Sequence, residues 1–90
     1  MLYGEHHLSP TIFSKGGYRF FFYANERNEA PHVHVQYHDA VAKFWISPVR
    51  LAGNHGMTSV ELSRAFSLVE QNEKLIMEKW NGFFSSKKNK

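Results

Sequence analysis

The sequence predicts an α+β fold, in which a small antiparallel sheet of three to five strands carries a C-terminal helix packed on one face. Two observations support this prediction. Short segments rich in aromatic and β-branched residues, separated by turn-forming residues, follow one another up to about residue 46. The last third of the chain instead places apolar residues at the spacing of a helix. Strands followed by a helix are typical of α+β proteins.

Four segments have the composition and the turn-bounded length of strands: residues 11–13, 17–24, 31–37 and 41–46. The first two are predicted to form a hairpin through a turn at Ser14-Lys15-Gly16. Aromatic side chains at successive positions between Tyr18 and Tyr23 indicate a central strand that is covered on both faces.

The segments that join these strands are polar or rich in glycine. Residues 25–29 are predicted to be a polar loop, and His38-Asp39 a turn. Residues 49–52 fit either a short edge strand or one helical turn. Residues 53–56 fit a loop, because two glycines and an asparagine tolerate a left-handed backbone.

The helix has a clear predicted start. Thr58 and Glu61 match a capping box, and Met57 and Leu62 occupy the positions of a hydrophobic staple. The polar residues 71–73 interrupt the apolar stripe, so the helix is predicted to be kinked or split there. The stripe that we expect to face the sheet consists of Leu62, Ala65, Phe66, Val69, Ile76, Trp80 and Phe83.

Length and composition predict one small domain. We expect residues 1–10 to be a poorly ordered lead-in, residues 11–84 to form the α+β domain, and residues 85–90 to be a basic tail. The chain has no cysteine, which excludes disulfides and zinc–thiolate sites and favours a reducing compartment. Without a signal peptide or a membrane-length apolar run, the sequence predicts a cytoplasmic protein with no membrane partner.

The positive net charge of the chain comes from its tail. Lys87, Lys88 and Lys90 account for three of the eleven basic residues, and the remaining eight balance eight acidic residues. Nucleic-acid binding requires Lys and Arg side chains gathered on one surface. Only the basic tail therefore supports a nucleic-acid partner.

The best candidate for a functional site is a strip of histidines. Between His32 and His38 the residues alternate with a period of two, so one strand face carries His32, His34, Gln36 and His38. Imidazole is the commonest metal ligand and titrates near neutral pH. The candidate functional strip consists of His32 and His34 together with Glu29, which precedes the strand.

Two interpretations of this strip compete. Histidines two residues apart on a strand have Cα atoms about 6.5–7 Å apart and can reach one ion, so His32, His34, His38 and Asp39 are candidate metal ligands. The other interpretation is a solvent-facing surface on which the histidines donate hydrogen bonds. It is preferred because no third ligand is evident, and no cofactor is then expected. Glu26 and Glu29 could form a carboxylate pair for acid–base chemistry, but in the polar loop both are expected to be solvated.

Several segments resemble domain-of-unknown-function family 4160, and the similarity runs from about residue 11 to residue 84. The most specific part is Pro31-His32-Val33-His34 with the aromatic strand before it. The other segments are residues 18–23, Asn25-Glu26, residues 29–35, 42–45 and 54–56, Glu61-Leu62, residues 68–70, Trp80-Asn81 and Phe83-Phe84. The resemblance implies a small bacterial cytosolic protein, often encoded beside a protein of family 2442 in pairs suggested to be toxin–antitoxin-like. It implies no established activity.

The sequence favours a non-enzymatic interaction module, and the resemblance implies that its protein partner is encoded by a neighbouring gene. The first alternative is a metal-dependent enzyme, a nuclease or hydrolase, that uses His32 and His34 with a divalent ion. The second alternative is a nucleic-acid binder.

Overall fold

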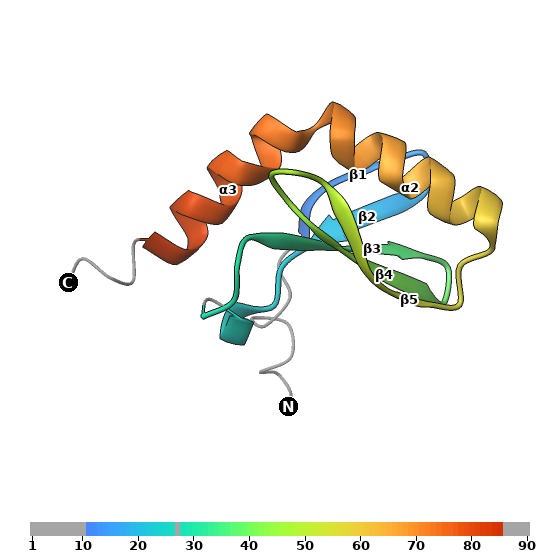
Figure 1. Cartoon of the computed structure of the whole chain (residues 1–90), viewed down its shortest axis with the longest axis horizontal. Coiled ribbons are helices and arrows are strands. Elements are labelled where there is room, and N and C mark those ends of the chain that lie inside the picture. Colours follow the sequence, from blue (N-terminus) through green and yellow to red (C-terminus); the bar gives the residue numbers. More distant parts are fainter. Residues whose placement is uncertain (1–10, 27, 86–90) are drawn as a thin grey trace.

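The computed structural model describes residues 11–26 and 28–85, which form a five-stranded antiparallel sheet followed by two helices (Figure 1). This arrangement confirms the predicted α+β fold and the split of the C-terminal helix. The predicted lead-in and residues 86–90 of the predicted tail lie outside the described residues. The strands are β1 (Thr11–Lys15), β2 (Tyr18–Phe21), β3 (His32–Tyr37), β4 (Ala40–Trp45) and β5 (Arg50–His55). The helices are η1 (Ala24–Glu26, a 3-10 turn), α2 (Ser59–Gln71) and α3 (Glu73–Ser85).

The sheet is a meander, since its strands lie in sequence order from β1 to β5. The β1–β2 hairpin turns at Gly16 and Gly17, whose φ angles of 61° and 87° are both positive, as a type I′ turn requires. The turn predicted at residues 14–16 therefore begins two residues later, at Gly16, and ends at Gly17. Strand pairing keeps β1 extended as far as Lys15, which lies opposite Tyr18.

Residues 50–55 form the edge strand β5, one of the two alternatives that the sequence left open for residues 49–52. The loop predicted at residues 53–56 is therefore wrong for residues 53–55. Residues 50–55 pair with β4, from Arg50 opposite Trp45 to His55 opposite Val41. Gly53 and Asn54 have low intrinsic preference for strands. The hydrogen bonds that these residues form with β4 outweigh their low preference for strands. Only the neighbouring strand can supply those hydrogen bonds.

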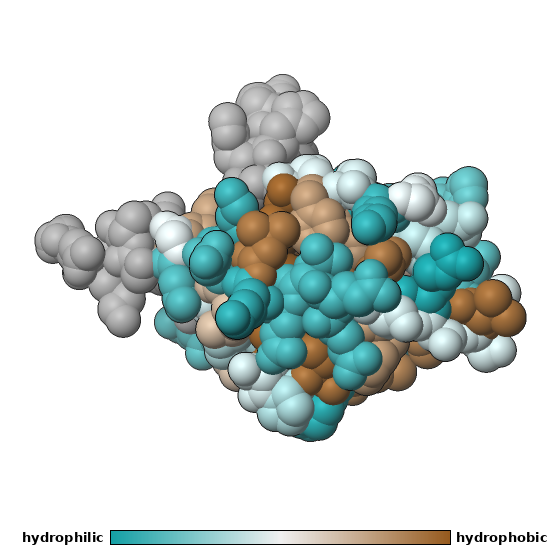
Figure 2. Space-filling model, turned by 90° about the horizontal axis from the view of Figure 1, so that it is seen from above, coloured by the Kyte–Doolittle hydropathy of each residue, from teal (hydrophilic) through white to brown (hydrophobic). Residues whose placement is uncertain are grey.

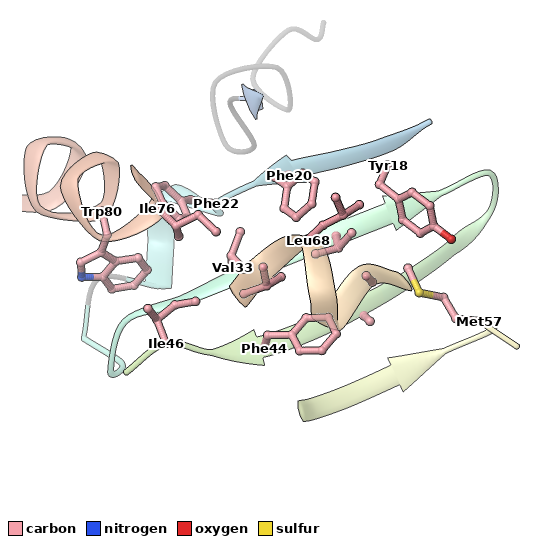
Figure 3. Close-up of a cluster of buried hydrophobic side chains, with 14 of the residues drawn as sticks. Tyr18, Phe20, Phe22, Val33, Phe44, Ile46, Met57, Leu68, Ile76 and Trp80 are labelled. Carbon is pink, nitrogen blue, oxygen red and sulfur yellow. The ribbon is translucent and has the colours of Figure 1, made fainter. Parts of the chain in front are cut away.

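Both helices lie on the same side of the sheet (Figure 1). In Figure 3, side chains of the strands and of the helices point toward one another and form a single core. The sheet contributes three completely buried residues to this core, Phe20, Val33 and Phe44. Trp80 of α3 is 6% exposed, which confirms that the C-terminal stripe docks on the core. Neither helix in the described part of the chain has the length and apolar character needed to cross a bilayer.

The predicted helix boundaries are confirmed. The backbone amide of Glu61 donates to Thr58 Oγ1 at 3.1 Å, and the amide of Thr58 donates to Glu61 Oε1 at 3.0 Å, so the capping box is complete. The break falls at Asn72, whose side-chain amide donates to the carbonyl of Leu68 at 2.8 Å. The backbone amide of Asn72 donates to the same carbonyl at 3.2 Å, so the side chain adds a second hydrogen bond at the point where α2 ends.

Replacing Thr58 by alanine is expected to lower the free energy of unfolding by about 1 kcal/mol, the usual loss for an N-cap residue. The substitution removes the acceptor for the Glu61 amide, while Thr58 itself is exposed and fills no core space. Urea unfolding of both proteins measures the difference. Thr58→Ser, which keeps the hydroxyl, serves as the control, and equal losses in the two variants would contradict the capping role.

Candidate metal centre

His32 and His34 lie at the start of β3 on the sheet face opposite Val33 and Val35, as the alternation predicts. Their register partners on β4 are Trp45 and Lys43, whereas Val33 and Val35 belong to the core beneath the helices. The two imidazole rings have centroids 5.2 Å apart. The strand therefore presents both rings together.

The expected solvent-facing surface is wrong, because both histidines are buried. His32 is 0% exposed and His34 is 7% exposed. The indoles of Trp45 and Trp80 lie 5.7 Å and 5.0 Å from the His32 ring. Burial of His32 thus depends on a strand and a helix that are distant in sequence.

Aromatic side chains also surround His34. The rings of Phe21 and Tyr23 lie 5.4 Å and 4.6 Å from its imidazole. Phe21 lies on the sheet face away from the helices, yet it is only 2% exposed. The strand that contains it was predicted to be covered on both faces, and Phe21 is covered on this second face. Both histidines therefore sit in an apolar surrounding, where an unpaired polar atom is costly.

A single carboxylate oxygen joins the two histidines. Glu26 Oε1 lies 2.7 Å from His32 Nε2 and 2.8 Å from His34 Nε2. Glu26 is not solvated in a loop as expected, since its side chain is only 20% exposed. The 3-10 turn η1 orients it, with the amide of Glu26 donating to the carbonyl of Tyr23 at 3.2 Å.

The other ring nitrogen of His32 defines which protons the ring carries. Nδ1 lies 2.9 Å from the carbonyl oxygen of Ala30. A carbonyl only accepts hydrogen bonds, so Nδ1 carries a proton. In the neutral ring Nε2 then presents its lone pair, and in the imidazolium it donates to Glu26. A backbone carbonyl that holds Nδ1–H is the usual support for a metal-binding histidine.

The electrostatics favour an ionised carboxylate beside a neutral His34. Burial acts to raise the pKa of Glu26, but hydrogen bonds from His32 and His34 outweigh it and hold the pKa below its ordinary value of 4.5. Burial lowers the pKa of His34 below its ordinary value of 6.5, and Glu26 opposes only part of this shift. Deprotonated carboxylate and neutral imidazole are the forms that bind metal ions.

The remaining candidates lie beside the cluster or far from it. Glu29 pairs with Lys43 at 2.7 Å, and its oxygen is 3.7 Å from His32 Nδ1, so it borders the cluster. His38 and Asp39 form the exposed turn at the other end of β3, where His38 has a φ of 55°. Six residues of strand separate His38 from His32 by roughly 20 Å. The structure therefore does not bring His38 and Asp39 into the site.

The ligand atoms of Glu26, His32 and His34 all lie within 4.8 Å of one another. Metal ions hold such nitrogen and oxygen atoms at about 2.0–2.2 Å, so ligands at right angles are about 2.9 Å apart and tetrahedral ones about 3.4 Å apart. The observed nitrogen-to-oxygen distances of 2.7 Å and 2.8 Å need only a small expansion to admit an ion. Two imidazoles and one carboxylate are a ligand set for Zn²⁺ or Fe²⁺.

Comparison with known proteins identifies the family. The model of the family described as Domain of unknown function (DUF4160) matches residues 17–81. The chain belongs to this family. The DUF4160 match contains Glu26, His32 and His34, and its description assigns no activity. No curated protein and no solved structure matches the chain.

Sequence reasoning missed Glu26 as the third member of the cluster. It precedes His32 by six residues in a loop, and no periodicity links a loop residue to a strand face. The available signal was the Asn25-Glu26 segment between the aromatic strand and Pro31-His32, which forms part of the DUF4160 resemblance.

Proposed function

We propose that this DUF4160 protein binds a divalent transition-metal ion through Glu26, His32 and His34. The observation that carries the proposal is one carboxylate oxygen of Glu26 within 2.8 Å of the Nε2 atoms of two buried histidines. The hydrogen bond from His32 Nδ1 to the Ala30 carbonyl adds support, because an ion that displaces the proton between Nε2 and Glu26 would then meet the lone pair of Nε2.

Three protein ligands would leave further coordination positions on the ion, as in hydrolytic zinc sites and non-haem iron sites. Because both histidines are buried, water or a substrate would reach the ion from the side of Glu26, whose side chain is 20% exposed. A bound ion would lower the pKa of such a water and supply a hydroxide nucleophile. The proposed metal chemistry therefore supports the enzyme alternative, a hydrolase or nuclease.

Calorimetric titration with Zn²⁺ tests the proposal on the full chain produced without a histidine tag. We expect about one equivalent to bind, and Glu26→Gln and His34→Gln to weaken binding by at least about tenfold. Binding should also weaken on acidification, because protons compete for the imidazole nitrogens. His38→Gln, which removes an imidazole outside the cluster, should bind Zn²⁺ like the wild type.

Circular dichroism verifies that each variant is folded. Zn²⁺ binding that survives Glu26→Gln, or that His38→Gln reduces equally, would overturn the proposed metal centre. The absence of binding to the wild type would leave the cluster as a hydrogen-bonded ion pair that stabilises the β2–β3 connection.

We infer a second function, the binding of a protein encoded by a neighbouring gene, in a toxin–antitoxin-like pair. The resemblance described in the sequence analysis implies such a pair, and the exposed edge strand β5 offers a surface to a partner. Co-expression of the two proteins tests it, since a stable pair should co-purify through a tag on the neighbour's product. Separate elution of the two proteins would contradict it.

A further inference from the structure

Strand β5 ends the described sheet with one side of its backbone unpaired. The strand order places β4 on its inner side, and no described strand follows on its outer side. All its residues except Gly53 are exposed. In an antiparallel sheet, about half of the backbone amides and carbonyls of an edge strand point away from its partner. β5 therefore offers a row of hydrogen-bonding groups to another extended chain.

β5 has only some of the features that usually protect an edge strand: it carries the charge of Arg50, and its pairing with β4 shifts register between Leu51 and Gly53. Its sequence, Arg-Leu-Ala-Gly-Asn-His, contains no lysine and no proline, the residues that commonly discourage pairing at an edge. The opposite edge, β1, is one residue shorter and ends in Lys15. The two edges are therefore not equivalent, and β5 is the one suited to accept a strand.

An apolar groove runs between β5 and α2. It has a volume of about 330 Å³, and Leu51, Leu62 and Phe66 line it together with Phe44, Ser63 and Ser67. Leu51 is 45% exposed, although it is a large apolar residue. Figure 2, which views the helix side of the molecule, shows apolar surface beside the polar outer face of the helices. An apolar side chain of an added strand would lie against these residues.

The two faces of β5 differ in chemistry. Leu51 lies opposite Phe44, on the face that the helices cover, whereas Arg50 and His55 lie opposite Trp45 and Val41 on the other face. Both Arg50 and His55 are exposed, and β5 contains no acidic residue. A strand that pairs with β5 is therefore complementary to it when apolar residues on the face toward the helices alternate with acidic residues on the other face.

A second copy of the chain is a poorer match for this edge. Antiparallel pairing of two β5 strands about their midpoint places Arg50 of one copy opposite His55 of the other. No carboxylate on either strand compensates these basic groups. Charge complementarity thus favours an acidic segment from a different protein.

We propose that the outer edge of β5 and the groove beside α2 bind an extended acidic segment of a partner protein as a sixth strand. Apolar side chains of that segment fill the space between Leu51, Leu62 and Phe66, and its carboxylates face Arg50 and His55. This surface deepens the second proposed function, on which it rests for a partner, and it does not depend on the metal centre.

Nuclear magnetic resonance of the ¹⁵N-labelled full chain tests this surface with a blocked hexapeptide in which valine and glutamate alternate. We expect the peptide to shift the amide signals of β5 and to slow their hydrogen exchange. A matched peptide with lysine in place of glutamate should bind at least about tenfold more weakly, because its ammonium groups would face Arg50. Arg50→Glu should reverse the preference between the two peptides.

Lys15→Glu makes the same charge change at the other edge of the sheet and should leave both affinities unchanged. Equal binding of the two peptides, or unchanged β5 signals at the highest peptide concentration, would overturn the proposal. Sedimentation that shows a dimer lost in Arg50→Glu would also overturn it in favour of a second copy. The peptides probe the purified chain alone, so their failure leaves the co-purification result standing and separates the two proposals.

Discussion

Replacing Trp80 by alanine is expected to lower the free energy of unfolding by about 3–5 kcal/mol, the usual cost of truncating a buried tryptophan. The indole is 6% exposed and has ring centroids 4.1 Å from Phe84 and 5.3 Å from Phe22. It joins α3 to the strand side of the core. Its loss would leave a cavity at this junction and would also uncover one side of His32, whose ring lies 5.0 Å away.

Urea unfolding measures this loss. Glu78→Ala is the control, because Glu78 is an exposed residue of the same helix and should cost less than about 0.5 kcal/mol. In a Trp45→Phe background, the fluorescence of Trp80 reports on its environment directly. Emission that is fully open to solvent quenchers, or a loss no greater than that of Glu78→Ala, would contradict the docking of α3.

Replacing Glu26 by alanine in metal-free protein is expected to cost roughly 2–4 kcal/mol. The substitution removes the oxygen that lies within 2.8 Å of both Nε2 atoms, and neither histidine can reach water easily because both are buried. A buried polar group left without its partner costs about 1–3 kcal/mol, and two such groups are affected here. Glu26→Gln, which keeps an acceptor oxygen, should lose less.

Unfolding in the presence of a chelator measures this effect. The control is Glu29→Gln, since Glu29 forms its ion pair with Lys43 at a side chain that is 40% exposed. Surface pairs of this kind contribute about 0–1 kcal/mol. If Glu26→Ala were no more destabilising than Glu29→Gln, the cluster would not stabilise the fold. Comparing the variants with and without Zn²⁺ then separates the structural role of the carboxylate from metal binding.

The metal centre and the β5 edge lie on different parts of the sheet and use different chemistry. The histidines lie at the start of β3, the central strand of the sheet, whereas β5 is an edge strand. Every buried side-chain nitrogen and oxygen atom of the described residues has a hydrogen-bond partner, so the cluster is a satisfied network before any ion binds. A metal ion must therefore compete with the existing hydrogen bonds, which makes affinity the decisive measurement.

Local patterns in the sequence determined a large part of this structure. The period-two alternation placed His32 and His34 on one strand face, because successive side chains of a strand always point to opposite sides. The capping residues Thr58 and Glu61 predicted the start of α2, and the polar residues at Asn72 predicted its end. These features depend on neighbours within four residues, so sequence alone suffices for them.

Long-range contacts decided the rest. Gly53 and Asn54 form a strand because β4 pairs with them, against their own preferences. His32 is buried because Trp80, forty-eight positions later, packs against it, and Glu26 reaches both histidines only because η1 turns its side chain toward β3. The sequence therefore determined which residue types share the candidate site's strand face. Only the tertiary structure decided that this face is buried and that a carboxylate completes it, because both depend on how separate elements pack together.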